Sequence, residues 1–176
     1  MRDGFKTARM TAAPLRPEHL RRLARLFGDP EAAKTLGGVL SPEQAAQRFN
    51  RFLQHWLDHG FGVWVFIDDG DGEFVGYAGL MKTVVEGGEE VMLLYALMPR
   101  YWGEGRATEM SRAALDEDFE RIGTPDVVAF TLPMNRASRR VMEKLGFQYE
   151  RDIVHAALPH VLYRLSIDQW RKADDT

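Results

Sequence analysis

The sequence predicts a mixed α/β fold built on one mixed sheet, with about seven strands and four main helices. Apolar, β-rich runs occur between segments with helical periodicity. Two of these runs, 61–67 and 73–81, are joined by a short acidic, glycine-rich turn, which is typical of an antiparallel hairpin. Two later runs, 89–98 and 126–132, are joined through a helix, which predicts that they are parallel neighbours.

The N-terminal third predicts one strand and two helices. Residues 5–16 are patterned as a weak strand, and residues 17–27 as a helix that begins at a proline. The second helix has the clearest start, because Ser41 and Gln44 have the spacing of a capping box. Gly60 is expected to end this helix.

The C-terminal half predicts two helices and three strands. After the strand at 89–98, a helix runs to about Ile122, and the strand at 126–132 follows. Asn135 is expected to cap the last helix and Gly146 to close it. The runs 147–155 and 160–167 are the final two strands.

Composition limits the classes of protein that are compatible with the sequence. The 176 residues fit a single domain spanning 1–176 with a short C-terminal tail, and 45% hydrophobic and 28% charged residues are ordinary values. No apolar run approaches the ~20 residues of a membrane span, and the N-terminus has no apolar core. We therefore expect a cytoplasmic protein with no membrane partner.

Charge and cysteine content exclude further classes. The formal net charge of −3 gives no support to nucleic-acid binding. The absence of cysteine excludes disulfides, thiolate metal sites and a cysteine nucleophile. The acidic turn at 68–72 lacks the ligand order and closing glutamate of a calcium loop, so we expect a solvated turn and no metal.

The stretch MPRYWGEGRATEM, residues 98–110, predicts an anion-binding loop. It places Gly103 and Gly105 between an apolar strand and a helix start, where backbone N–H groups have no partner inside the helix and the helix dipole favours negative charge. Arg100, Arg106 and Thr108 could add side-chain contacts to a phosphate. The local pattern alone is equally compatible with a tight turn that binds nothing.

Two common nucleotide loops do not fit this stretch. A Walker loop requires Gly-x-x-x-x-Gly-Lys-Ser/Thr, which is not the pattern here. A dinucleotide loop has a third glycine or alanine where this chain has Thr108, and an acidic residue at the end of the next strand. That strand ends FTLPMN, without a carboxylate.

Three ordered motifs resemble the GNAT acetyltransferases. Residues Arg100 to Ala107 match the family's pyrophosphate loop, Arg/Gln-x-x-Gly-x-Gly/Ala. The segments HWLDHGFGVWVF, YALMPRYWGEGRATE and PMNRASRRVMEKLGF resemble the branch that includes the ribosomal-protein-alanine acetyltransferases. The resemblance extends over about residues 7–165.

The resemblance implies a GNAT fold that binds acetyl-CoA between two splayed, parallel central strands. In the family, the cofactor arm pairs with the backbone near Leu97 and Met98, and an N–H near Leu97 faces the thioester carbonyl, where a fixed donor stabilises developing negative charge. The cofactor-binding residues that the resemblance implies are Leu97, Met98, Trp102, Gly103, Glu104, Gly105, Arg106, Ala107, Thr108, Asn135, Ser138 and Arg140.

The chain departs from this branch at both positions that usually move protons. The glutamate that is the usual base is replaced by Met92. Glu90 lies two residues earlier on the same strand face and could act through a water, or it could be an exposed carboxylate at a strand end. The tyrosine that is the usual acid is replaced by Met142, which leaves Ser138 as an acid or as an ordinary capping residue.

Five residues are candidates for the acceptor pocket: Trp56, Phe61, Trp64, Tyr95 and His155. The four aromatic residues could equally be core. His155, late in a predicted strand, could instead make hydrogen bonds at a strand edge.

The expected function is N-acetyl transfer from acetyl-CoA to a primary amine, either a protein N-terminus or a small molecule. The alternative is a CoA-binding module of this fold with little or no turnover, and a nucleotide-dependent enzyme is a third hypothesis. Homodimers are common in the family, but the sequence identifies neither the oligomeric state nor the acceptor.

Overall fold

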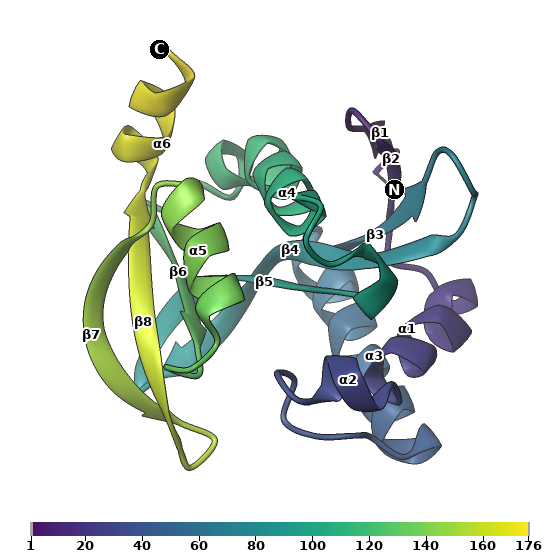
Figure 1. Cartoon of the computed structure of the whole chain (residues 1–176). Helices are drawn as coiled ribbons and strands as arrows, with labels where there is room; N and C mark the ends of the chain where they lie inside the picture. Colours follow the sequence, from purple (N-terminus) through teal and green to yellow (C-terminus); the bar gives the residue numbers. More distant parts are fainter. Residues whose placement is uncertain (1, 176) are drawn as a thin grey trace.

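The computed structural model describes residues 2–175, which form one eight-stranded sheet and six α-helices (Figure 1). The strand order is β1-β2-β3-β4-β5-β6-β8-β7, and only the β5/β6 pair is parallel. This mixed sheet confirms the predicted fold class. The strands are β1 (Phe5–Lys6), β2 (Met10–Pro14), β3 (Val63–Asp68), β4 (Phe74–Val85), β5 (Gly88–Leu97), β6 (Asp126–Thr131), β7 (Gln148–His155) and β8 (Leu158–Ser166).

The helices begin where the capping residues predict. Ser41 accepts a hydrogen bond from the Gln44 N–H at 3.2 Å, Gln44 accepts one from the Ser41 N–H at 3.0 Å, and Gly60 ends the helix with φ +72°. No described helix is both long and apolar enough to cross a bilayer. The helices are α1 (Leu20–Phe27), α2 (Pro30–Ala33), α3 (Pro42–His59), α4 (Arg106–Ile122), α5 (Arg136–Lys144) and α6 (Ile167–Asp174), with 3₁₀ turns η1 (Pro17–His19) and η2 (Pro99–Tyr101).

The structure differs from the sequence-based expectation at both ends of the chain. The strand expected over 5–16 is a hairpin of β1 and β2, because the Thr7 N–H donates to the Met10 carbonyl at 2.8 Å and reverses the chain. The C-terminal tail contains α6, which a Ser166–Gln169 capping box starts and the buried Trp170 anchors. The capping-box spacing was a readable signal for α6.

Helices cover both faces of the sheet. Trp64 of β3 donates its indole N–H to Asp118 of α4 at 2.8 Å. Trp64 pairs with the residue that follows Tyr77, so Trp64 and Tyr77 point to opposite faces. The Tyr77 ring packs on Phe27 of α1 and Phe52 of α3, at 6.0 and 5.4 Å between ring centroids. We call these the α4 face and the α3 face of the sheet.

The parallel strands β5 and β6 diverge after a single point of pairing, Met92 opposite Val128. At their N-terminal ends, Arg164 of β8 forms ion pairs with Glu90 of β5 and Asp126 of β6. Among residues 2–175, no ion pair joins the opposite ends of the two strands. The sheet therefore opens as a V toward the carboxyl ends of β5 and β6.

Candidate active site

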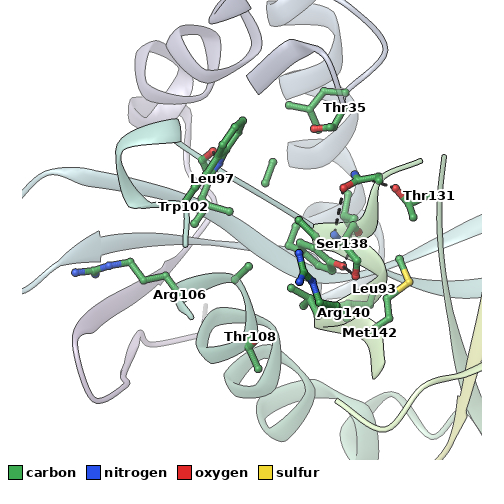
Figure 2. A pocket seen from close by; sticks show the side chains of 18 of the residues that line it. Thr35, Leu93, Leu97, Trp102, Arg106, Thr108, Thr131, Ser138, Arg140 and Met142 are labelled. Carbon is green, nitrogen blue, oxygen red and sulfur yellow. Dashed lines mark hydrogen bonds between the residues drawn. The ribbon is translucent and has the colours of Figure 1, made fainter. Parts of the chain in front are cut away.

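A cleft of about 540 Å³ occupies the opening between β5 and β6 (Figure 2). Its walls come from β5, the loop that follows β5, the end of β6, α5 and the segment between α2 and α3. Among the predicted cofactor and acceptor residues, the structure brings together the following ones at this cleft: Tyr95, Leu97, Trp102, Gly103, Gly105, Arg106, Ala107, Thr108, Asn135, Ser138 and Arg140.

The loop after β5 presents a row of free backbone donors. Gly103 and Gly105 have φ angles of +75° and +78°, a conformation that other residues rarely adopt. Within the described part of the chain, the N–H groups of residues 103–108 donate to no other group. The Trp102 N–H, in contrast, donates to the Pro99 carbonyl at 3.1 Å. The expected row of donors is therefore confined to residues 103–108.

These residues fit the pyrophosphate arm of a CoA molecule. A Cβ atom built on Gly103 would meet no atom within 4 Å, and one on Gly105 only the Arg9 guanidinium at 3.9 Å, so the backbone is open to close approach. Arg140 and Lys144 of α5 line the same cleft, and neither side chain has an ion-pair partner among residues 2–175. Free N–H groups at a helix start together with unpaired cations form a suitable donor set for phosphates.

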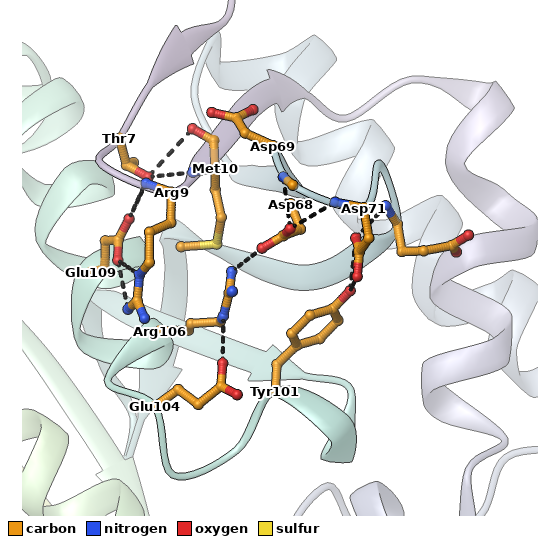
Figure 3. A network of polar contacts seen from close by, with 12 residues as sticks. Thr7, Arg9, Met10, Asp68, Asp69, Asp71, Tyr101, Glu104, Arg106 and Glu109 are labelled. Carbon is orange, nitrogen blue, oxygen red and sulfur yellow. Dashed lines mark hydrogen bonds and ion pairs between the residues drawn. The ribbon is translucent and has the colours of Figure 1, made fainter.

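The side chains of Tyr101 and Arg106 point toward the β3–β4 turn, where they bind Asp71 and Asp68 (Figure 3). Arg106 forms an ion pair with Asp68, and its Nε donates to Glu104 at 2.9 Å. Figure 2 shows Arg106 pointing away from Arg140. The Arg106 guanidinium is already paired with Asp68 and Glu104, which argues against the expected contact of this side chain with phosphate. The Glu104 side chain is likewise not part of the cleft wall.

The acidic turn thus anchors the loop. The Tyr101 hydroxyl donates to Asp71 at 2.9 Å, and Arg100 Nη2 donates to the same carboxylate at 3.0 Å. Backbone N–H groups of the turn and the Arg106 guanidinium hold the pKa of Asp68 below its usual value. The turn that was expected to be merely solvated therefore shapes the cofactor loop.

The end of β5 presents one backbone unit to the cleft. The Met98 N–H donates to the Val75 carbonyl at 2.8 Å, and the Met98 carbonyl accepts from the Tyr101 N–H at 3.0 Å. Met98 is therefore not available to a cofactor, contrary to the expectation. Because donors alternate along an antiparallel ladder, the Leu97 N–H and carbonyl face the opening, and that carbonyl accepts from the Trp102 indole at 2.9 Å.

Asn135, Ser138 and Tyr95 form a hydrogen-bonded chain in the cleft wall. Asn135 caps α5 by accepting from the Ser138 N–H at 3.1 Å and donates to Thr131 at 3.1 Å. The Ser138 and Tyr95 hydroxyls lie 2.7 Å apart. Burial raises the pKa of Tyr95 to about 12, so its hydroxyl stays protonated. Tyr95, which was expected in the acceptor pocket, lies on the α4 face beside α5, on the cofactor side of the opening.

Glu90 does not lie in the cleft. Both of its carboxylate oxygens accept from Arg164, at 2.9 and 3.0 Å, at the closed end of the V. The hydrogen bonds that the Arg164 guanidinium donates to the carboxylates of Glu90 and Glu150 raise the pKa of Arg164. This carboxylate is held in an ion pair on the far side of the β5/β6 contact, so the structure argues against Glu90 as the base.

The remaining predicted acceptor residues also lie outside the cleft. Trp64 is fully buried, and Trp56 packs on it at 5.1 Å between centroids. Phe61 packs edge-on against the buried His55. His155 packs on Phe130, a cleft residue, at 4.7 Å but does not itself line the cavity. Trp56, Phe61 and Trp64 are core residues, as their alternative interpretation allowed.

Other residues form the end of the cleft on the α3 face. The sequence analysis did not identify them. The only sequence signal for this face was the alternation of side chains along β5, which puts Leu94 on the opposite face from Tyr95. These residues are Thr35, Leu36, Tyr77, Met92, Leu94 and Phe130.

Comparison with known proteins decides the family. The sequence model of the acetyltransferase (GNAT) domain matches residues 9–148. The chain belongs to the GNAT acetyltransferase family. The family uses acetyl-CoA, and the chain is accordingly an acetyl-CoA-dependent acyltransferase. This result favours the enzyme over the CoA-binding module and the nucleotide-dependent enzyme.

Two curated relatives resemble the GNAT chain over most of its length. The uncharacterized protein YkkB of Bacillus subtilis is 30% identical over 138 residues, which are 78% of this chain and 80% of YkkB. The FsC-acetyl coenzyme A-N(2)-transacetylase of Aspergillus fumigatus is 30% identical over 157 residues, 81% of this chain and 64% of that protein. An acetyltransferase from Agrobacterium tumefaciens has the same fold, with a TM-score of 0.81 and 23% identity over 94% of this chain and 95% of its own.

Proposed function

We propose that this GNAT enzyme transfers the acetyl group of acetyl-CoA to the nitrogen of a primary amine, on a protein N-terminus or a small molecule. The observation that carries the proposal is a cleft that passes between β5 and β6, with phosphate donors on the α4 face and a separate end on the α3 face. The name of the Aspergillus relative, an N(2)-transacetylase, supports transfer to nitrogen. The ribosomal-protein-alanine branch stays a prediction.

The proposed cofactor contacts are mainly with the backbone. The N–H groups of residues 103–108 bind the pyrophosphate, and Arg140 adds positive charge from α5. The bound cofactor supplies an activated acetyl thioester. The Leu97 N–H, which faces the opening, donates a hydrogen bond to the acetyl oxygen and stabilises the negative charge that develops there.

The proposed proton donor is the hydroxyl pair of Ser138 and Tyr95. Ser138 is fixed at 2.7 Å from the Tyr95 hydroxyl, which also donates to the Ser138 carbonyl at 3.0 Å. A fixed hydroxyl can donate a proton to the departing thiolate. The Tyr95 hydroxyl donates to the Ser138 carbonyl, so Tyr95 is a positioning group. Ser138 therefore has the catalytic part: it gives its proton to the thiolate and regains one from the water that accepts the proton of the amine.

The proposal can be tested by measuring thiol release from acetyl-CoA with a panel of primary amines. Ser138→Ala should lower kcat at least about tenfold and leave the KM for acetyl-CoA nearly unchanged. The alanine variant keeps the helix cap, because Asn135 bonds the backbone N–H of Ser138. Tyr149→Phe, an exposed tyrosine on β7, is the control. Absence of transfer to every amine would refute the proposed function.

A further inference from the structure

The cleft changes character as it passes through the sheet. On β5, Tyr95 faces α5 whereas Leu94 and Met92 face the other side, because side chains alternate along a strand. Figure 2 shows Thr35 at the end of the cleft away from Thr108. We call the α3-face portion the acceptor end, a name that rests on the proposed function. Its residues are Thr35, Leu36, Tyr77, Met92, Leu94 and Phe130.

Tyr77 presents an unpaired hydroxyl to the acceptor end. The residue is only 4% exposed, and its ring is held between Phe27 and Phe52. Its hydroxyl has no hydrogen-bond partner among residues 2–175, and the residue lines the cleft. Burial raises the pKa of Tyr77 to about 12, so the group is a neutral donor. Because this hydroxyl reaches the cleft without a protein partner, a ligand in the cleft can accept its hydrogen bond.

The surroundings of this hydroxyl are apolar and, farther out, positive. Leu36, Met92, Leu94 and Phe130 provide four apolar side chains at the acceptor end. The Arg48 guanidinium lies behind them, over the Phe27 ring and donating to the Leu36 carbonyl at 3.3 Å.

The charged side chains that line the rest of the cleft without an ion-pair partner among residues 2–175 are Arg140 and Lys144, and both are cations. A ligand with several positive charges would be repelled by these groups and would lose its hydration against apolar walls.

We infer that the acceptor is a primary amine on an apolar body, with an uncharged carbonyl oxygen that accepts the Tyr77 hydrogen bond. Apolar groups of the body replace water along Leu36, Leu94 and Phe130. The single polar contact orients the body, so that the nitrogen points through the opening toward Leu97. An amide of an apolar amino acid has this chemistry, and a polyamine does not.

The test compares kcat/KM for three probe amines in wild type and in Tyr77→Phe. Phenylalaninamide carries the carbonyl, phenethylamine lacks it, and spermidine is a polycation. Tyr77→Phe should lower kcat/KM about tenfold for phenylalaninamide and change it little for phenethylamine, as expected for one hydrogen bond. Titration calorimetry of phenylalaninamide into the enzyme with CoA should show the same loss in affinity. Tyr149→Phe is the matched control.

The outcomes separate this inference from the proposed function. Higher kcat/KM for spermidine than for phenethylamine would overturn the acceptor class while leaving amine acetylation in place. An equal loss for both aromatic amines in Tyr77→Phe would show a structural role and overturn the inference. Acetylation of no amine would overturn the proposed function and this inference together.

Discussion

Replacing Glu90 with glutamine tests whether this carboxylate is a general base or an ion-pair partner that stabilises the closed end of the V formed by β5 and β6. The carboxylate makes two hydrogen bonds to Arg164, and the two side chains are 19% and 26% exposed. A hydrogen bond to a charged group contributes about 1.5–3 kcal/mol to stability, and less where the pair is partly exposed. Arg164 keeps Asp126 at 2.6 Å and Glu150 at 2.8 Å, and removing one of three carboxylates relieves their repulsion.

The net loss for Glu90→Gln is therefore about 1 kcal/mol of unfolding free energy, or about 2–4 °C in Tm for a chain of this size. The effect on catalysis should be small, with kcat within about threefold of wild type, whereas removal of a general base costs about 10²–10⁴-fold. Calorimetric melting and steady-state acetyl transfer measure the two quantities. Glu89→Gln, an exposed neighbour on β5, is the matched control.

The reasoning would be refuted by the opposite pattern. A loss of kcat above about 100-fold with an unchanged Tm would mean that Glu90 moves a proton. The same conclusion would follow if the plot of kcat against pH has an inflection in the acidic range for the wild type and none for Glu90→Gln.

Three further predictions concern the loop and the core. Gly105→Ala should raise the KM for acetyl-CoA about tenfold or more, because Gly105 has a φ of +78° in the backbone segment that binds the cofactor. The control is Gly87→Ala, at a glycine that has a φ of +82° in the β4–β5 turn, and it should lower only stability. Asp71→Asn should raise the same KM about three- to tenfold with kcat unchanged, because it weakens the contacts of Tyr101 and Arg100 with the turn. Asp69 contacts Thr11 instead, so Asp69→Asn should leave this KM unchanged. His55 accepts from the Lys82 N–H at 3.0 Å and lies 2.9 Å from the Phe61 carbonyl, so it is neutral, and burial lowers its pKa. Its contribution to stability is present above its unfolded pKa of about 6.5 and is lost as the pH falls through the lowered folded value. Melting curves of the wild type should therefore show a lower Tm at pH 5.5 than at pH 7.5. This fall in Tm should be smaller in His55→Gln and the same as in the wild type in His59→Gln.

Sequence reasoning worked best where one short segment contains the whole structural reason. Ser41 and Gln44 cap α3 through bonds between residues three apart, and Asn135 caps α5 in the same way. It failed where an element depends on a distant partner. The region 5–16 has strand propensity throughout, but the turn between Thr7 and Met10 divides it into two strands, and the pairing of β2 with β3 holds the second one in the sheet.

The functional site shows the same contrast between features set by local sequence and features set by distant partners. The cofactor loop could be located because its donors are consecutive N–H groups, 103–108, whose freedom follows from a glycine turn before a helix. The roles of its side chains could not, since Arg106 turns toward Asp68, which lies on another hairpin. Trp64 was an equally good core or pocket candidate by composition, whereas Tyr77 was not singled out.

By itself, the sequence determined the mixed sheet, the helix caps, the GNAT resemblance and the backbone cradle for the cofactor, because local periodicity, capping and glycine conformation control each of them. Only the tertiary structure decided which face each strand residue occupies, and so placed Tyr77 at the acceptor end and Trp64 in the core. It also paired Glu90 with Arg164, 74 residues away. Strand register and long-range ion pairs result from packing the complete sheet, and no local pattern encodes them.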